Sequence, residues 1–215
     1  MIVEDRLRTF LNSLDRGNPE WLDELERRAV ADRVPIIRKE TQSFLRLLLA
    51  VRRPASILEV GAAVGFSALL MSEYMPEGCR ITTIENDGKR AEQARGNFCR
   101  TGREDRIRLL EGDAGEVLKS LPGPFDFIFM DAAKGQYPNF LPEVLRLLGP
   151  GGILVSDNVL QDGDLLESRY AVRRRDRTIH ARMREYLYEL THHPDLETSV
   201  LPVGDGVTVS VRRAV

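Results

Sequence analysis

The chain has 215 residues, of which 42% are hydrophobic and 30% are charged, a length and composition typical of one globular domain. This composition is too apolar for a disordered chain and excludes a fibrous one. With 31 Lys and Arg against 33 Asp and Glu, the formal charge of -2 excludes a uniformly basic nucleic-acid-binding protein, so a nucleic-acid partner would need a local basic patch.

The two cysteines, Cys79 and Cys99, stand singly and without metal-ligand spacing. They indicate neither a disulfide framework nor a zinc site, which favours a reducing compartment. Charged residues occupy the N-terminus where a signal peptide would be apolar, and no apolar run approaches the roughly 18 residues of a membrane span. We therefore expect an unprocessed, soluble, cytoplasmic protein without a membrane partner.

Apolar residues at helical spacing fill the first part of the chain. Asn18-Pro19-Glu20 predicts a helix start, with Asn18 as the N-cap residue and proline at the first helical position. The pattern changes at Arg52-Arg53-Pro54. We predict one domain, in which a helical cap over residues 1–53 covers a core formed by residues 54–215.

From Ser56 onward, short runs rich in β-branched and aromatic residues alternate with segments of helical length. The predicted strands lie at residues 57–60, 80–85, 106–111, 125–131 and 152–157. This alternation predicts parallel strands joined by crossover helices, with both faces of the sheet covered. The glycine-rich residues 148–152 are expected to end the helix before the fifth strand.

A helix over about residues 169–191 precedes two strand-like runs, 196–202 and 206–212. The turn Val203-Gly204-Asp205-Gly206 joins these runs closely, which predicts a hairpin at one edge of the sheet. The predicted fold class is therefore α/β, with a doubly wound, seven-stranded, mostly parallel sheet and a C-terminal antiparallel hairpin.

The first strand leads into EVGAAVGFS, which places Gly61 and Gly65 in the turn between strand and helix. Glycine permits this turn and a close approach of a ligand at the carboxyl edge of the sheet. The G-x-x-x-G spacing departs from the G-x-G-x-x-G dinucleotide pattern and argues against a nicotinamide cofactor. Glu59 would repel a pyrophosphate and suit a cationic amino-acid moiety such as that of S-adenosylmethionine.

Acidic residues also follow the second and third predicted strands. Glu85 could accept hydrogen bonds from both hydroxyls of a ribose. Asp113 could accept one from an adenine amino group, while the backbone N–H of Ala114 donates to a ring nitrogen. Taken singly, each acid is as well explained as a helix N-cap, and Gly61 and Gly65 as turn residues. Three successive strand ends with such residues favour a methyl-donor site.

The fourth and fifth predicted strands end in Asp131 and in Asp157-Asn158. Two carboxylates and an amide oxygen on neighbouring strand ends suit Mg²⁺ or a similar divalent cation. Such a cation, bound to two adjacent substrate oxygens, would lower the pKa of a substrate hydroxyl and orient it toward a methyl sulfonium. Lys134 could take the proton or stabilise the oxyanion. Alternatively, Asp131 caps a helix, Lys134 is a surface residue and Asp157-Asn158 forms a loop turn.

The segments EVGAAVGFS, IEND, GDA, DAAKGQYPNF, SDNVL and PVGDGV resemble, in order and spacing, those of cation-dependent O-methyltransferases of the catechol and caffeoyl-coenzyme A type. The resemblance covers roughly residues 34–213. It implies a Rossmann-like class I methyltransferase fold and S-adenosylmethionine as the methyl donor. It also implies a divalent metal held by Asp131, Asp157 and Asn158, with Lys134 as the catalytic lysine.

The same resemblance implies further site residues. Asp131 would act in catalysis as well as in metal binding, and Asp205 in the VGDG turn would line the acceptor pocket. The implied donor contacts are Gln42, Glu59, Gly61, Gly65, Ser67, Glu85, Asp113, Ala114 and Asp131. We also expect a homodimer.

Within the family, DAAKGQYPNF, SDNVLQDG and the arginine-rich residues 169–184 most resemble bacterial tRNA 5-hydroxyuridine methyltransferases. This implies tRNA as partner and methylation of wobble 5-hydroxyuridine, whose 5-hydroxyl and 4-oxo groups could chelate a metal as a catechol does. The candidate RNA contacts are Arg173, Arg174, Arg175 and Arg177, since arginine suits phosphates and unpaired bases. The arginines could equally form a solvated helix face or pair with acids of a second subunit.

Three alternatives stay open. A catechol-like or caffeoyl-CoA-like small molecule would be methylated by the same catalytic residues. A nicotinamide oxidoreductase is the enzymatic rival, and an adenosine-ligand-binding protein without catalysis is the non-enzymatic one.

Overall fold

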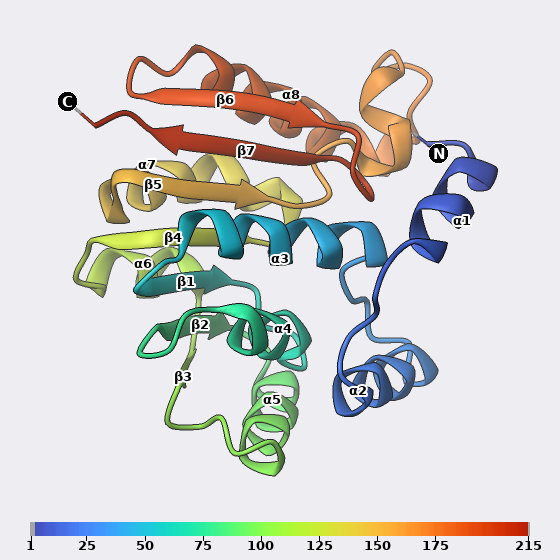
Figure 1. Cartoon of the computed structure of the whole chain (residues 1–215). Helices are drawn as coiled ribbons and strands as arrows, with labels where there is room; N and C mark the ends of the chain where they lie inside the picture. Colours follow the sequence, from blue (N-terminus) through green and yellow to red (C-terminus); the bar gives the residue numbers. More distant parts are fainter. Residues whose placement is uncertain (1–2, 215) are drawn as a thin grey trace.

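Figure 1 shows the computed structural model, in which residues 3–214 are described. The strands form one sheet in the order β3-β2-β1-β4-β5-β7-β6. Strands β1 to β5 pair in parallel, whereas β7 pairs antiparallel with both β5 and β6. The predicted seven-stranded, mostly parallel sheet with a C-terminal hairpin is confirmed. The strands are β1 (Ser56–Val60), β2 (Arg80–Glu85), β3 (Ile107–Glu111), β4 (Phe125–Met130), β5 (Leu148–Ser156), β6 (Leu196–Leu201) and β7 (Val207–Arg212).

Helices cover both faces of the sheet, and the two helices nearest the N-terminus lie to one side (Figure 1). One face carries α3 (Lys39–Arg52), α4 (Phe66–Tyr74) and α5 (Gly88–Arg100). The opposite face carries α6 (Ala114–Ser120), α7 (Tyr137–Leu147) and α8 (Arg177–His192). The remaining helices are α1 (Asp5–Ser13), α2 (Glu20–Ala31) and the 3-10 helices η1 (Lys134–Gln136), η2 (Gln161–Leu166) and η3 (Arg174–Asp176).

The central strand β4 explains why the sheet has two apolar cores. Its sequence FDFIFM is almost continuously apolar, as expected for a parallel strand covered on both faces. Phe127 and Phe129 pack into the core beneath α3, α4 and α5, whereas Ile128 and Met130 pack into the core beneath α6, α7 and α8. Burial of each such side chain contributes about 1.5–3 kcal/mol to the free energy of unfolding.

Part of the predicted cap over residues 1–53 belongs to the helical layer that packs on the sheet. Helix α3 lies on the sheet and contributes the fully buried Leu45 and Leu49 to the first core. Helix α2 adds Leu22 to the same core. Within residues 3–214, no helix combines the length and apolarity that crossing a membrane requires.

The fifth strand begins earlier than residue 152, where the sequence predicts it. Helix α7 does end at Leu147, but Leu148 pairs at once with Phe125 of β4. The register of β4 and β5 then shifts, and glycine accommodates the irregularity, because a Cβ on Gly152 would lie 2.7 Å from the carbonyl oxygen of Gly149. The glycine-rich residues therefore end one element and begin the next.

The predicted helix over residues 169–191 begins later, because α8 starts at Arg177. The preceding residues form a turn, in which the backbone N–H of Ala171 donates to the carbonyl of Ser168 at 2.9 Å. The Arg177 guanidinium donates to the carbonyl oxygens of Tyr170 and Val172, both at 3.3 Å. Local side-chain bonds thus replace the first predicted helical turns.

Candidate active site

A cavity of about 730 Å³ lies at the carboxyl ends of the central parallel strands, where open α/β sheets bind ligands. Its volume falls within the usual range for small-molecule sites. The cavity brings together most of the predicted donor and catalytic residues. Those that line it are Gly61, Ser67, Glu85, Asp113, Ala114, Asp131, Lys134 and Asn158.

The two glycines of the first loop are required by contacts within the protein. Gly61 has a φ of +102°, and a Cβ there would lie 2.3 Å from the carbonyl oxygen of Asp131. Gly65 has a φ of +82°, and a Cβ there would lie 2.5 Å from the ring of Phe98. Both glycines therefore permit a close approach to neighbouring protein segments, and Gly61 also lines the cavity. For Gly61, that approach brings the first loop against Asp131.

Glu85 lies at the cavity wall and also organises the first loop. One carboxylate oxygen accepts a hydrogen bond from the backbone N–H of Ala63 at 2.7 Å. The other accepts from the backbone N–H groups of Asn86 and Asp87 at 3.0 and 2.9 Å. A carboxylate has about four lone-pair sites, so capacity is left for a ligand hydroxyl.

Asp113 combines the two roles that the sequence leaves open. It accepts a hydrogen bond from the backbone N–H of Glu116 at 3.2 Å and so caps α6. It also lines the cavity beside Ala114, the first residue of that helix. The N-cap explanation and the ligand explanation are therefore compatible.

Glu59 is expected at the ligand surface, but the structure places it one layer deeper. Its side chain is fully buried, and Oε2 accepts a hydrogen bond from the Thr83 hydroxyl at 2.5 Å. The other carboxylate oxygen, Oε1, has no hydrogen-bond partner among the described residues. Burial raises the pKa of Glu59 to about 7, although the hydroxyls of Ser67 and Thr83 act in the opposite direction. Ser67 itself lines the cavity, so its side chain is near both the buried Glu59 and the cavity surface.

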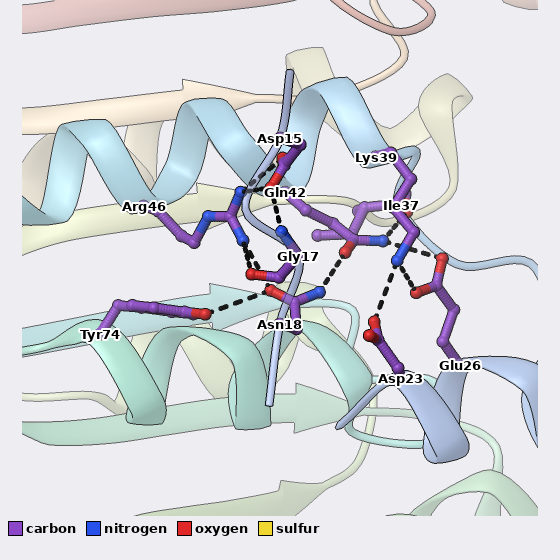
Figure 2. Close-up of polar contacts among 10 residues, drawn as sticks. All are labelled: Asp15, Gly17, Asn18, Asp23, Glu26, Ile37, Lys39, Gln42, Arg46 and Tyr74. Carbon is purple, nitrogen blue, oxygen red and sulfur yellow. Dashed lines mark hydrogen bonds and ion pairs between the residues drawn. The ribbon is translucent and has the colours of Figure 1, made fainter. Parts of the chain in front are cut away.

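The structure does not bring Gln42 to the cavity, although the resemblance implies a contact with the donor there. Gln42 is 1% exposed, and its amide is used within the protein, as Figure 2 shows. Its Nε2 donates to the carbonyl oxygen of Ile37 at 3.0 Å and to Glu26 at 3.2 Å. Its Oε1 accepts from Asn18 at 2.8 Å. Because Ile37 lines the cavity, Gln42 supports the cavity wall from behind.

The hydrogen bond between Asn18 and Gln42 also corrects the predicted N-cap of α2. Asn18 does not cap this helix, because its side-chain N–H group donates to Gln42 and its Oδ1 accepts from Arg46 at 2.9 Å and from Tyr74 at 3.3 Å. Helix α2 begins at Glu20 with Pro19 in the N-cap position. A longer-range network has replaced the local cap, and it ties the linker between α1 and α2 to α3 and α4 (Figure 2).

Asp131 and Lys134 form an ion pair at the cavity wall. The Lys134 ammonium donates to Asp131 Oδ1 at 2.7 Å and to the hydroxyl of Tyr137 at 2.9 Å. Tyr137 is fully buried, and its hydroxyl also lies 2.9 Å from the carbonyl oxygen of Met130. Burial raises the pKa of Tyr137 well above its ordinary value, so this residue holds Lys134 as a neutral hydroxyl.

Sequence reasoning did not select Tyr137. A signal was present, since Tyr137 follows Lys134 by three residues within DAAKGQYPNF and so can lie beside it on a helical turn. Its burial, which is what makes the hydroxyl a fixed support, depends on α8, whose Tyr186 packs against it edge to face at 5.3 Å between ring centroids.

Asp157 is the buried member of the predicted metal site. The backbone N–H of Asp157 donates to the carbonyl oxygen of Met130 at 3.0 Å, which places the ends of β4 and β5 side by side. Burial, followed by the charge of Asp131, raises the pKa of Asp157 to about 7. Asn158 lines the cavity with a left-handed backbone, φ 59°, a conformation that asparagine tolerates better than most residues.

The three predicted metal ligands fit a divalent cation by their chemistry. They offer oxygens only, and the two like charges oppose each other without a cation. Among the described residues, no group of three or more His, Cys, Asp and Glu side chains could hold a metal ion. The candidate site differs from such groups because its third ligand would be the Asn158 amide.

A second hollow of about 670 Å³ adjoins the cavity, and Lys134 and Asn158 line both. Asp205 lines this hollow, as the resemblance implies for an acceptor pocket. Burial and a hydrogen bond that Asp205 donates to Asp162 in its protonated form raise the pKa of Asp205 to about 6.

The structure separates the four candidate RNA contacts. Arg173 and Arg175 are exposed and line the second hollow. Arg174 is exposed beside them. Arg177 instead donates to carbonyl oxygens of the turn before α8. Three of the four arginines are therefore exposed at or beside the second hollow, whereas Arg177 is used within the protein, and RNA binding by any of them stays a prediction.

Comparison with known proteins decides the family. The O-methyltransferase family profile matches residues 12–213. The chain belongs to the O-methyltransferase family. The predicted resemblance is confirmed at this level, which favours a methyltransferase over a nicotinamide oxidoreductase or a non-catalytic binding protein.

This O-methyltransferase is 32% identical to the catechol O-methyltransferase of Mycobacterium tuberculosis over 176 residues, which cover 79% of this chain and 77% of that protein. It is 38% identical to the catechol O-methyltransferase of Niastella koreensis over 128 residues, which span 58% of each protein. Its fold matches the SAH-bound methyltransferase of Podospora anserina with a TM-score of 0.88 and 28% identity, covering 98% of this chain and 95% of that one.

The buried Glu59 predicts a pH-dependent stability. Its pKa of about 7 in the folded protein exceeds the ordinary value of 4.5, so the folded state binds more protons than the unfolded state between these values. The free energy of unfolding therefore decreases as the pH rises from 4.5 to 7, by about 3 kcal/mol from this group. Glu59→Gln should remove this contribution.

We expect Glu59→Gln to gain stability relative to the wild-type protein as the pH is raised from 5 to 8, as measured by urea denaturation of the ligand-free protein. An equal difference between the two proteins at both pH values would show that Glu59 is already ionised at pH 5.

Proposed function

We propose that this O-methyltransferase transfers the methyl group of S-adenosylmethionine to a hydroxyl of a catechol-like small molecule, with Mg²⁺ or a similar divalent cation. One observation carries the proposal: Lys134 and Asn158 line both the large cavity and the second hollow, so they lie where a donor and an acceptor would meet. Relatives named catechol O-methyltransferase and caffeoyl-CoA O-methyltransferase support the acceptor class.

The cavity residues fit the donor. Glu85 can accept hydrogen bonds from ribose hydroxyls, and Asp113 and Ala114 offer an acceptor and a backbone donor for adenine. Glu59 adds a buried acid beneath the loop, with one oxygen unpaired, which favours a cationic ligand over a pyrophosphate. When bound, the donor supplies a methyl group on a positively charged sulfur.

Asp131, Asp157 and Asn158 would hold the cation, because they offer a set of oxygens at neighbouring strand ends. When bound, the cation supplies positive charge that lowers the pKa of a substrate hydroxyl. It would also relieve the repulsion between the two carboxylates, which after burial is the second cause of the raised pKa of Asp157.

Lys134 can stabilise the acceptor oxyanion without moving. An ammonium has three N–H donors, of which two are used by Asp131 and Tyr137. The third has no acceptor among residues 3–214 and could donate to an acceptor oxygen at the junction of the cavity and the hollow. Because the two protein contacts fix the ammonium beforehand, little reorganisation is needed as negative charge develops on the oxygen.

The direct test is methylation of catechol by the purified protein with S-adenosylmethionine and Mg²⁺, followed by mass spectrometry of the product. We expect turnover that EDTA abolishes while circular dichroism stays unchanged, because the cation is needed for the reaction and not for the fold. Full activity in EDTA would contradict metal chelation, and no methylated catechol would contradict the acceptor class.

Donor affinity should depend on Glu85. Loss of a charge-assisted hydrogen bond worth about 1.5–3 kcal/mol should lower the affinity of Glu85→Ala for S-adenosylmethionine about 10- to 100-fold, measured by calorimetry. Glu111→Ala is the matched control. Glu111 lies opposite Glu85 at the end of the neighbouring strand β3, but its carboxylate binds Arg95 and does not line the cavity. Equal affinities in both variants would refute the ribose placement.

The chemical step should depend on Lys134. Lys134→Ala removes the fixed ammonium, so we expect kcat to fall by about 10²–10⁴-fold. The dissociation constant for S-adenosylmethionine should stay within about threefold of wild type, since the donor residues are retained. Single-turnover assays with catechol measure the first quantity and calorimetry the second. A wild-type kcat would make Lys134 a structural residue only.

A second candidate acceptor is 5-hydroxyuridine in tRNA. The observation that favours it is the exposed rim of Arg173, Arg174 and Arg175 beside the second hollow, where phosphates could bind. The chemistry would be the same, because its 5-hydroxyl and 4-oxo groups are also adjacent oxygens.

Replacing these three arginines together by alanine should separate the acceptors. If they bind phosphates, the slope of log affinity for tRNA against log salt should flatten by about 0.7–0.9 for each phosphate that the variant no longer binds. Methylation of catechol should persist in the same variant, because a neutral catechol carries no phosphate. An unchanged slope would leave the small molecule as the acceptor.

A further inference from the structure

Three segments that are distant in the sequence meet at Arg38, the residue before α3. Its guanidinium Nη2 lies 2.8 Å from Asp162 Oδ1 and 2.5 Å from Asp205 Oδ1. Asp162 belongs to the segment that follows β5, at the non-helical start of η2, and Asp205 belongs to the turn between β6 and β7. We call this group of three side chains the Arg38 clasp.

The clasp lies between the two halves of the candidate active site. Residues 35–37, directly before Arg38, line the large cavity. Asp162 and Asp205 line the second hollow. A single guanidinium therefore connects a wall of the donor side with two walls of the acceptor side.

The loop after β5 needs an external support. Asn158, Gln161 and Asp162 have φ values of 59°, 49° and 55°, in the left-handed region, which costs of order 1 kcal/mol for a residue other than glycine. A loop with such a backbone keeps one conformation only if side chains or neighbouring segments hold it there. The loop includes Asn158, so its position also fixes a candidate metal ligand.

Two backbone hydrogen bonds join this loop to the hairpin turn. The N–H of Val159 donates to the carbonyl oxygen of Gly206 at 2.9 Å, and that of Leu160 donates to the carbonyl oxygen of Asp205 at 3.0 Å. Gly206 permits this approach, since a Cβ there would lie 2.4 Å from Leu160 Cγ. Loop and turn thus form one unit, and Arg38 makes an ion pair with a carboxylate in each part of it.

We propose that Arg38 is a positioning residue, which holds the 158–163 loop and the hairpin turn in place so that the second hollow keeps its shape for the acceptor. The identity of the acceptor rests on the proposed function, but the positioning does not. The side chains of Arg38 and Asp162 are 32% and 57% exposed, so their pairing contributes little to global stability and its loss should act locally.

Hydrogen exchange tests the positioning without any substrate. In Arg38→Met, we expect the peptide covering residues 158–166 to exchange about five- to tenfold faster than in the wild-type protein, with α5 unchanged. Arg28→Met is the matched control, because Arg28 makes an exposed ion pair with Glu24 on α2 and should leave this peptide unaffected. Unchanged exchange of residues 158–166 in Arg38→Met would overturn the proposal.

Kinetics with catechol then distinguish positioning from a general loss of structure. In Arg38→Met, we expect KM for catechol to rise about tenfold, while calorimetry gives a donor dissociation constant within about twofold of wild type. Arg38→Lys should recover part of the loss, because its ammonium can still reach one of the two carboxylates. A parallel loss of donor affinity and melting temperature would overturn the proposal in favour of a structural role.

The two measurements also separate this proposal from the proposed function. If wild-type protein fails to methylate catechol, the acceptor class is wrong and hydrogen exchange alone decides the role of Arg38. If wild-type protein is active and Arg38→Met equals it in KM and in exchange, the clasp has no positioning role.

Discussion

The candidate site depends on two carboxylates and one ammonium, those of Asp131, Asp157 and Lys134, that the fold holds close together. Asp131 and Asp157 follow paired residues of neighbouring strands, so the sheet itself brings their charges together. Lys134 compensates one of them directly, at 2.7 Å from Asp131. Asp157 is buried without such a partner, and its raised pKa shows the cost. A divalent cation would remove that cost, which supports the proposal that the reaction uses one.

The acids at the strand ends are predictable because topology alone determines where they lie. In a parallel sheet the carboxyl ends of the strands share one edge, so Glu85, Asp113 and Asp131 have to surround one cavity once the strands are recognised. Glu59 is harder to place because it is inside β1, where both faces are covered. The sequence predicts its side chain at the ligand, but the side chain lies beneath that surface, against Thr83 of the adjacent strand.

The N-terminal residues cannot be placed from the sequence because their partners are distant. Asn18 has the pattern of a helix cap, but Gln42, 24 residues later, competes for its amide. Gln42 in turn carries no signal that its own amide faces Ile37 instead of a ligand. The start of α8 is a similar case, since the carbonyl groups that bind Arg177 become available only when the preceding turn forms. Tertiary contacts outweigh local propensity in each case.

The most direct test of the carboxylate pair is the thermal stability of the protein with and without Mg²⁺ in the absence of donor and acceptor. If the pair holds the cation, Mg²⁺ at concentrations above its dissociation constant should raise the melting temperature of the wild-type protein. Asp157→Asn, which removes one of the opposing charges, should be more stable than wild type without Mg²⁺ and should no longer respond to it. An equal response of both proteins to Mg²⁺, or none in the wild-type protein, would contradict the account.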